Sequence, residues 1–238
     1  MSNNCSVCMA AYNGEKYIYA QVKSILDQLA EDDELIISND SSTDKTIEVL
    51  NSLGDKRIRI VKNAHKKGPV GNFSTALENA RYDYIFLADQ DDLWLPGKVK
   101  KHMQLMQQYE LVISDAVVIT EGGKILFDSF FEARGAGKGL LRNLKKNSYL
   151  GCCMSFRRSL LNKAFPFPEG LYMHDWWLGL VAEVEGNICF CPDKYLHYIR
   201  HSDNVTQTLQ QTLPFLQRVT NRWGFIKGLT SLKMQGKI

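Results

Sequence analysis

Apolar runs and amphipathic stretches alternate through the first half of the chain. Runs of this kind are typical of strands buried on both faces of a parallel sheet. We predict such strands at residues 5–11, 35–37, 58–61 and 84–88. Between them, apolar side chains recur at the spacing of one helix face, beginning with Ile18, Val22, Ile25 and Leu29. This alternation predicts an α/β fold with a mostly parallel, Rossmann-like sheet flanked by helices.

The second half of the chain has a less regular pattern. A hairpin turn is expected at Glu121-Gly122-Gly123, and a helix should begin near His174. Strands are expected around them, at residues 111–114, 116–120, 149–156, 188–191 and 195–199. No internal repeat is visible.

The C-terminal tail is predicted to form an amphipathic helix from Thr212 to Lys233. Its apolar positions are interleaved with basic ones, and Trp223 lies next to Arg222. Basic residues beside Trp suit an anionic membrane interface. The helix is therefore expected either to lie on a membrane surface or to pack on its own domain, and the sequence does not choose between them.

Three carboxylates directly follow the fourth predicted strand. They belong to Asp89, Asp91 and Asp92. Ligands of open α/β sheets bind outside the carboxyl ends of the strands, so these acids should stand at the mouth of a site. Crowded carboxylates repel one another unless a proton or cation neutralises them, and Mg²⁺ combines protein carboxylates with substrate phosphates. We predict a divalent-cation site; an acidic helix N-terminus is the alternative.

Two other strand ends carry conspicuous polar groups. Tyr12 and Asn13 follow the first strand, and Asp40 follows the second. In a parallel sheet these ends lie along one edge, beside the acidic cluster. An aromatic ring, a carboxylate for a base or ribose, and a metal-binding cluster suit a nucleotide diphosphate. For Asp40 and Asp44, simple helix capping is the alternative.

Composition and length limit the class of protein. The chain has 238 residues, 45% hydrophobic and 23% charged, and its net charge of +3 is too small to indicate nucleic-acid binding. Because no leader or membrane-spanning run is visible, we expect a cytoplasmic protein. Cys5-x-x-Cys8 suggests a redox or zinc pair, but residues three apart on a strand point to opposite faces. The cysteines are expected to be small buried hydrophobes.

The polar segments resemble motifs of the family 2 glycosyltransferases, which have the nucleotide-diphospho-sugar transferase fold called GT-A. The resemblance runs from Val7 to about Val205 and is greatest to bacterial rhamnosyltransferases of surface-polysaccharide synthesis. Asn39 and Ser41 stand where the family usually has Asp and Gly. The matching segments are Ala11-Tyr12-Asn13-Gly14, Asn39-Asp40-Ser41-Ser42-Thr43-Asp44, Asp89-Gln90-Asp91-Asp92, Met173-His174-Asp175-Trp176-Trp177 and Arg200-His201-Ser202-Asp203-Asn204-Val205.

The resemblance implies a nucleotide-diphospho-sugar donor and a divalent cation, Mg²⁺ or Mn²⁺. The cation would be held by Asp91 with Asp89 and His201, and Asp92 is a further candidate ligand. It would stabilise the charge of the departing diphosphate. The donor-binding set that the resemblance implies is Ala11, Tyr12, Asn13, Asp40, Asn72, Asp89 and Asp91.

The resemblance also implies that Asp175 is the general base for the acceptor hydroxyl, in a single displacement with inversion. Asp175 is expected at a helix N-terminus, where the macrodipole favours the ionised carboxylate and makes it a weak base. Gly151, Cys152, Trp176 and Trp177 are implied on the acceptor side. Trp177 is equally suited to the core.

The donor is predicted by resemblance to be dTDP-rhamnose, and the acceptor a cell-surface polysaccharide or lipid-linked glycan. The alternatives are a UDP-hexose donor, a non-catalytic nucleotide-sugar-binding partner of an assembly complex, and a hydrolase that uses Asp91 and Asp175. We predict a nucleotide-binding half (1–108), an acceptor-binding half (109–205) and an amphipathic tail (206–238). Peripheral contact with the inner face of the plasma membrane through the tail remains one of its two expected roles.

Overall fold

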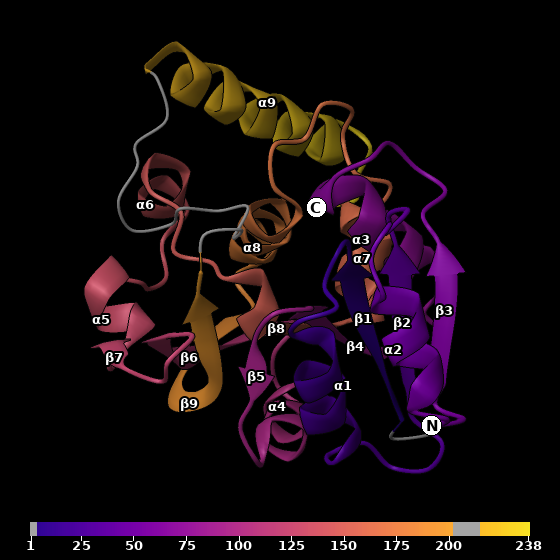
Figure 1. The fold of residues 1–238 in the computed structure, drawn as a ribbon. Helices are drawn as coiled ribbons and strands as arrows, with labels where there is room; N and C mark the ends of the chain where they lie inside the picture. Colours follow the sequence, from indigo (N-terminus) through magenta and orange to yellow (C-terminus); the bar gives the residue numbers. More distant parts are fainter. Residues whose placement is uncertain (1–3, 202–214) are drawn as a thin grey trace.

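The computed structural model describes residues 4–201 and 215–238 of the chain (Figure 1). Within these ranges, helices flank one mixed sheet of nine strands. The first four strands are parallel, in the order β3-β2-β1-β4. They are β1 (Cys5–Ala11), β2 (Glu34–Asn39), β3 (Ile58–Lys62) and β4 (Tyr84–Asp89). The predicted α/β fold is confirmed.

Each pair of consecutive parallel strands is connected through a helix. In the first helix, Ile18, Val22 and Ile25 are fully buried, as their helical spacing predicts. Pro69 lies at the start of the third, where its missing N–H costs nothing. The helices of this half are α1 (Ile18–Leu26), α2 (Thr46–Ser52), α3 (Pro69–Asn79) and α4 (Lys98–Leu105).

The sheet continues into the second half of the chain through β8 (Met154–Arg157). This strand is antiparallel to β4 on one side and to β6 on the other. The remaining strands are β5 (Leu93–Trp94), β6 (Leu111–Thr120), β7 (Ile125–Phe127) and β9 (Ile188–Arg200). The remaining helices are α5 (Phe130–Arg134), α6 (Leu140–Lys145), the 3₁₀ helix η1 (Gly151–Cys153), α7 (Arg158–Ala164), α8 (His174–Glu185) and α9 (Phe215–Met234).

Each of two predicted pairs of short strands forms one long strand in the structure: β6 replaces the first pair and β9 the second. β6 and β9 run parallel to each other through a register shift, at which Ser114 pairs with Cys191 and Asp115 with Lys194. Pro192 lies at this irregularity. Proline cannot donate a ladder hydrogen bond and is tolerated inside a sheet at such a bulge. The predicted strands on both sides of Pro192 are therefore confirmed, but the predicted interruption between these two strands is wrong.

The strand predicted at residues 149–156 was wrong in its first part. Gly151 to Cys153 form η1, and only Met154 onward joins the sheet. A Cβ on Gly151 would lie 3.2 Å from Cβ of Asp175, so the chain at this point packs closely against α8. Tertiary contact at the glycine, which the apolar pattern does not reveal, accounts for the difference.

The register of the parallel strands brings three polar strand ends together. Ala10 pairs with Asp89 of β4, and Ala11 pairs with Asn39 of β2. The loops that follow β1, β2 and β4 therefore leave the sheet at one edge, as predicted. The apolar parts of the same strands are buried in the core.

All six cysteines are unpaired, and five of them are buried. Cys5 and Cys8 lie in the interior of β1, where burial raises the pKa of the Cys5 thiol well above its usual value. The prediction that the cysteines are buried apolar side chains is confirmed for these residues. Among the helices that the structure describes, none has the length and apolar character needed to cross a bilayer.

The C-terminal helix α9 packs on α8, where the ring of Phe225 lies 4.7 Å from that of Trp176. Phe225 and Leu232 are buried, whereas Trp223 is 57% exposed. The packing on the chain's own domain, one of the two expected roles of the tail, is thus observed. Residues 206–214 of the predicted tail lie outside the described residues, as do residues 202–205 of the last motif.

Candidate active site

The loop after β1 is fastened to the acidic segment by Gln90. Its side-chain oxygen accepts from Tyr12 N at 2.9 Å, and its nitrogen donates to Tyr12 O at 2.8 Å. Gly14 leaves room for this amide, because a Cβ there would lie 2.2 Å from Gln90 Oε1. Tyr12 itself is 54% exposed. The sequence analysis assigned roles to the acids around Gln90 and missed the amide between them.

The loops after β1 and β2 are joined by Asn13. Its side-chain oxygen accepts from Thr43 N at 2.8 Å, and its own N–H donates to Ser42 Oγ at 3.0 Å. Asn13 has φ 47°, a left-handed conformation that asparagine tolerates better than most residues. The segment Ala11-Tyr12-Asn13-Gly14 therefore has a structural role of its own in shaping this edge.

Asp40 and Asp44 differ in what they hold. Asp44 Oδ1 accepts from Thr46 N at 3.0 Å at the start of α2, so the capping alternative applies to it. Asp40 is buried and accepts from Asn63 Nδ2 at 2.7 Å and from Gly68 N at 2.8 Å. These contacts fix the loop between β3 and α3, and they are not helix capping of α2.

Asn72 lies beneath the loop after β1. Its Nδ2 donates to Ala11 O at 3.1 Å, and the residue is 3% exposed. Its Oδ1 has no hydrogen-bond partner among the described residues. A buried amide oxygen without a partner carries a desolvation cost, so this atom is a candidate contact for a ligand group.

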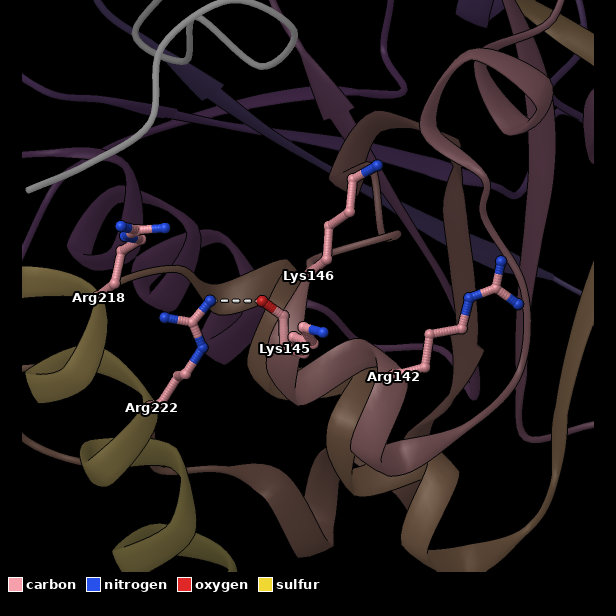
Figure 2. A pocket seen from close by; sticks show the side chains of 5 residues that line it. All are labelled: Arg142, Lys145, Lys146, Arg218 and Arg222. Atoms are coloured by element: carbon pink, nitrogen blue, oxygen red, sulfur yellow. Dashed lines mark hydrogen bonds between the residues drawn. The ribbon is translucent and has the colours of Figure 1, made fainter. Parts of the chain in front are cut away.

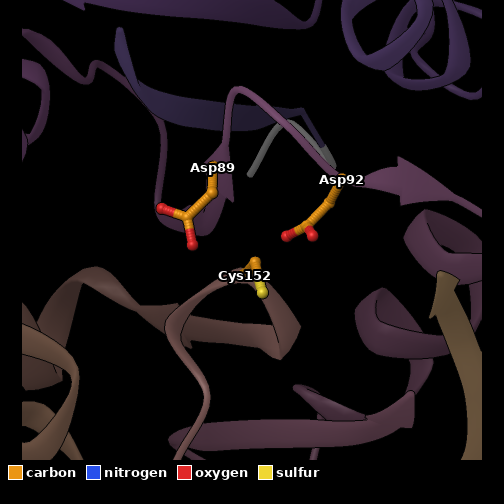
Figure 3. Close-up of side chains that lie close together, drawn as sticks. All are labelled: Asp89, Asp92 and Cys152. Carbon is orange, nitrogen blue, oxygen red and sulfur yellow. The ribbon is translucent and has the colours of Figure 1, made fainter. Parts of the chain in front are cut away.

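The acidic cluster consists of Asp89 at the end of β4, Asp92 before β5, and Cys152 of η1 (Figure 3). One potential ligand atom of each lies within 4.8 Å of the others. Asp92 is 2% exposed; its Oδ1 accepts from Ile199 N at 3.2 Å, whereas its Oδ2 has no partner among the described residues. Burial raises the pKa of Asp92 well above its usual range, and the charges of Asp91 and Asp89 raise it further.

Asp91 lies next to this cluster but has a different partner. His201 Nε2 and Asp91 Oδ2 are 2.8 Å apart, and the histidine ring stacks on Tyr17 with 4.5 Å between ring centres. The predicted ligand set of Asp91, Asp89 and His201 is thus found as an Asp91–His201 pair beside the group of Asp89, Asp92 and Cys152. Asp89, Asp91 and Asp92 come from one short segment, whereas Cys152 and His201 are brought to it from distant parts of the chain.

The acidic cluster fits a divalent cation. Burial first, and then repulsion from Asp91 and Asp175, raises the pKa of Asp89, which is the electrostatic condition that a bound cation would relieve. Burial also raises the pKa of the Cys152 thiol well above its usual value, so the sulfur stays protonated. A neutral thiol is a poor ligand for Mg²⁺, whose preferred ligands are the oxygens of Asp89 and Asp92.

A buried lysine contacts the residue of η1 that belongs to the cluster. Lys98 at the start of α4 has no exposed surface; its Nζ donates to Cys152 O and lies 4.0 Å above the Trp94 ring. Burial lowers the pKa of Lys98, and the nearby thiols and carboxylates oppose that shift. Sequence reasoning missed this residue because Lys-Val-Lys-Lys looks like a solvated helix face. The only sequence signal was its position in the first turn after Pro96 and Gly97.

Asp175 is buried in the first turn of α8. Its Oδ1 accepts from Trp176 N at 2.7 Å, and it is 5% exposed. Burial raises the pKa of Asp175 from 3.8 to about 6, although backbone N–H groups, chiefly those of Trp176 and Gly151, oppose the shift. The expectation that the helix dipole makes Asp175 a weak base is therefore wrong, because desolvation is the larger effect at this depth.

The 3₁₀ turn η1 connects Asp175 with the acidic cluster. A Cβ on Gly151 would lie 3.7 Å from Asp175 Oδ2 and 3.6 Å from His174 Nε2. The next residue, Cys152, faces Asp89 and Asp92 (Figure 3). The buried carboxylate of Asp175 and the acidic cluster are therefore held on either side of one short turn.

The two tryptophans after Asp175 serve mainly as packing groups. Trp177 has no exposed surface and donates its indole N–H to Ala164 O at 2.9 Å, so it occupies the core position that was one of its two expected roles. Trp176 is 7% exposed and donates to Asn143 O of α6 at 2.8 Å. Beside them, His174 stacks on Phe73 at 4.1 Å, and neither of its ring nitrogens has a partner among the described residues.

The family model of glycosyl transferase family 2 matches residues 6–165 of the chain. The chain belongs to this family. The match covers β1 to β4, the acidic cluster and η1, which are the elements that build the first side of the site. Asp175 and His201 lie beyond it.

Bacterial relatives of the chain are named for different donors. The chain is 29% identical over 194 residues to the UDP-Glc:alpha-D-GlcNAc-diphosphoundecaprenol beta-1,3-glucosyltransferase WfgD of Escherichia coli, covering 77% of this chain and 71% of the relative. It is 29% identical to the dTDP-rhamnosyl transferase RfbG of Shigella flexneri, covering 82% and 72%. Identity is 38% to the E. coli glucosyltransferase WfaP, but the chain spans only 43% of that protein's length.

Solved structures share the fold at low sequence identity. The fragment 1–349 of S. aureus TarS in complex with UDP-GlcNAc has a TM-score of 0.71 and 19% identity, over 94% of this chain and 66% of the fragment. The mannosyltransferase PcManGT of Pyrobaculum calidifontis, in complex with GDP-Man and Mn²⁺, has a TM-score of 0.62 and 16% identity, over 98% and 75%. The predicted GT-A fold is thereby confirmed.

Proposed function

We propose that this protein transfers a sugar from a nucleotide diphosphate to a hydroxyl group of a glycan, with inversion at the anomeric carbon. The observation that carries the proposal is the position of η1. Gly151 lies against Asp175, and Cys152 lies against Asp89 and Asp92. A base and a cation-binding group on either side of one turn suit a reaction in which one oxygen attacks and another departs.

The cation supplies electrostatic stabilisation of the leaving diphosphate when it is bound. Asp89 and Asp92 would hold it, and oxygens of the donor would complete its ligands. Asp91 and His201 are proposed as further ligands, because Asp91 acts electrostatically on both carboxylates of the cluster. The relatives' structures support Mn²⁺ as one suitable ion, since PcManGT is in complex with Mn²⁺.

Asp175 is the proposed general base. Its carboxylate accepts the proton of the acceptor hydroxyl as that oxygen bonds to the anomeric carbon. The bond from this carbon to the diphosphate oxygen breaks on the opposite side, and its electron pair leaves with the nucleotide. A pKa of about 6 suits this role, because such a carboxylate is ionised at neutral pH and is more basic than an exposed aspartate.

The donor would lie across the loops after β1, β2 and β4. We propose that Tyr12 stacks on the nucleotide base and that Asp40 contacts it, with Ala11 and Asn13 shaping the same edge. The unpartnered Oδ1 of Asn72 is the proposed acceptor of a donor hydroxyl or amide. On the other side of η1, Gly151, Cys152 and Trp176 would border the acceptor.

We propose dTDP-rhamnose as the donor and a lipid-linked glycan of a surface polysaccharide as the acceptor. RfbG supports this donor, and WfgD, which is named for a diphosphoundecaprenol acceptor, supports this acceptor. WfgD is also named for UDP-Glc, so UDP-hexose is the second candidate donor. Peripheral contact of α9 with the inner face of the plasma membrane would bring the enzyme to such an acceptor.

Thermal stabilisation by nucleotide diphosphates, each with and without Mn²⁺ or Mg²⁺, tests this proposal directly. A ligand of the folded state stabilises it by about 2.7 kcal/mol at a hundredfold excess over Kd. We expect metal-dependent stabilisation that is greater with thymidine diphosphate than with uridine diphosphate. The reverse preference would change the donor to UDP-hexose. Absence of stabilisation by every nucleotide would contradict the transferase proposal itself.

A further inference from the structure

The helix α9 has two apolar stripes rather than one. Phe225 and Leu232 are buried against the domain, and Gly228 allows the helix to approach Trp177, because a Cβ there would lie 2.7 Å from the indole. The second stripe contains Leu216, Val219, Trp223 and Ile226, which are 78%, 47%, 57% and 40% exposed. A helix turns about 100° per residue, so the two stripes point in nearly opposite directions. Intramolecular packing therefore explains only one of them.

A basic cleft lies beside the exposed stripe, between α6 and α9 (Figure 2). It has a volume of about 560 Å³, and all five of its described lining residues are cations. They are Arg142, Lys145, Lys146, Arg218 and Arg222. Like charges gathered in one cleft repel one another, so the field of these five cations favours an anion in the cleft.

The cleft is a built feature rather than a group of mobile surface lysines. Arg222 of α9 donates to Leu144 O at 2.9 Å and also to Lys145 O, and these bonds fix the two helices relative to each other (Figure 2). Lys146 Nζ donates to Arg134 O at 2.8 Å. Arg142 donates to Gly135 O. Among the described residues, the Lys145 ammonium has no hydrogen-bond or ion-pair partner, so its charge is left for a ligand.

Cations and exposed apolar side chains occur together on both helices. Arg218 and Arg222 flank the exposed stripe of α9, and α6 carries Leu141, 82% exposed, next to Arg142. A free phosphate would account for the cations but not for the exposed apolar groups. Phosphate headgroups next to acyl chains account for both, because Trp and Leu enter the interface while Lys and Arg bind the anionic surface.

We propose that the basic cleft between α6 and α9 binds the phosphate headgroup of an anionic phospholipid while the exposed stripe of α9 lies in the membrane interface. This inference rests on the proposed membrane contact of the protein and gives that contact a specific lipid site. Both helices also contact Trp176, through Asn143 O and Phe225, and Trp176 follows Asp175. A membrane bound at this site would thus be mechanically connected to the helix that carries the proposed base.

Vesicle co-sedimentation of the full chain, without donor, acceptor or metal, tests the proposal. Vesicles of phosphatidylcholine alone are compared with vesicles that also contain phosphatidylglycerol. We expect binding to the anionic vesicles only, and weaker binding as salt is added. Binding to neither vesicle, or equal binding to both, would overturn the proposal.

Paired variants identify the cleft as the site. Lys145→Gln with Arg218→Gln should weaken binding to anionic vesicles by about 25-fold, which is about fivefold for each cation. The matched control, Lys100→Gln with Lys124→Gln, removes two exposed lysines elsewhere and should retain most of the binding. Equal losses in the two double variants would mean that only net charge matters and would reject a specific site.

The exposed stripe is tested with Trp223→Ser, and Tyr19→Ser on α1 is the control with a similarly exposed ring. Only the first should weaken binding to vesicles. Transfer to a water-soluble acceptor should be unchanged in all these variants, so a failure of the transferase proposal appears in that assay alone. If the cleft variant bound anionic vesicles normally but lost affinity for inorganic pyrophosphate, the cleft would serve a soluble diphosphate and the lipid proposal would be wrong.

Discussion

The two sides of the candidate site are held in place by different means. On the proposed donor side, the loops after β1, β2 and β4 are fastened by polar side chains, with Gln90 hydrogen-bonded to Tyr12 and Asn13 to Thr43. On the proposed acceptor side, Asp175 is held by burial and by close packing against Gly151. Polar turn residues are visible in a sequence, whereas close packing is not. More of the proposed donor side could therefore be predicted from the sequence.

The difference also decides the electrostatics of the two sides. Desolvation raises the pKa of Asp44, but hydrogen bonds from the Thr46 hydroxyl and from several backbone N–H groups together outweigh it, and the pKa is lowered. Asp175 accepts similar bonds but is buried, and its pKa is raised to about 6. The pKa values of two aspartates near helix starts thus shift in opposite directions because only one of the two is deeply buried. Four experiments follow from this comparison.

The largest effect is expected from Asp175→Asn. Removing the base should lower kcat by about 10²- to 10⁴-fold, because a positioned general base contributes that much, while the KM for the donor changes little. The measurement is steady-state transfer to a glycan acceptor with the preferred donor. The control is Asp128→Asn, which removes an exposed surface carboxylate. Its kcat should be almost the same as that of the wild type. An Asp175→Asn enzyme of normal rate and normal fold would exclude Asp175 as the base.

The next effect concerns the acidic cluster. Asp92→Asn should lower the metal-dependent rate by about 10²-fold, since it removes one charge that stabilises the cation at the leaving group. The same change should raise the stability of the metal-free protein at neutral pH. The folded pKa of Asp92 is raised, so its ionisation costs stability as pH rises, and Asn avoids that cost.

Thermal unfolding with chelator and with Mn²⁺ separates these two consequences. Wild type should gain more stability from Mn²⁺ than Asp92→Asn does. Asp91→Ala should also weaken the response to Mn²⁺. Its metal-free gain in stability should be smaller than that of Asp92→Asn, because it relieves repulsion on Asp89 and Asp92 but also breaks the contact with His201. Equal Mn²⁺ stabilisation of wild type and both variants would contradict the proposed cation site.

The pH dependence of kcat/KM should show the burial of Asp175. The base acts when it is deprotonated, so the rate should rise with pH and level off above about 6, in line with the raised pKa. Profiles are measured at saturating metal, so that loss of the cation at low pH is not mistaken for protonation of the base. A rate that stays level down to the pKa of an exposed aspartate would show that burial does not control this group.

The smallest effect is expected on the donor side from Gln90→Ala. It removes two hydrogen bonds to the Tyr12 backbone, each contributing about 1 kcal/mol, so unfolding free energy should fall by about 1–2 kcal/mol. Donor affinity should fall with it, because the loop carrying Tyr12 loses its attachment. Gln104→Ala on the exposed side of α4 is the matched control for denaturant unfolding. A loss in kcat with unchanged donor affinity would instead connect Gln90 with the chemistry.

Much of the fold could be predicted from the sequence because the relevant signals are local. The apolar runs correctly indicated β1 to β4, and Pro69 and the turn residues correctly indicated helix starts and loops. The prediction was wrong at residues 149–153, where η1 replaces strand, and at Pro192, where one strand continues through a bulge. In both cases a contact with a distant segment, unseen in the local pattern, decided the backbone.

The sequence by itself determined the order of the elements, the sheet edge at which Asp40, Asp89 and Asp91 would meet, and the basic and apolar character of the tail. Only the tertiary structure decided which side chains contact one another in the site. It separated Asp91 with His201 from Asp89 with Asp92, buried Lys98 beneath them, and raised the pKa of Asp175. The physical reason is that charge, depth and neighbouring atoms depend on which segments pack together, and residue types along the chain do not fix that.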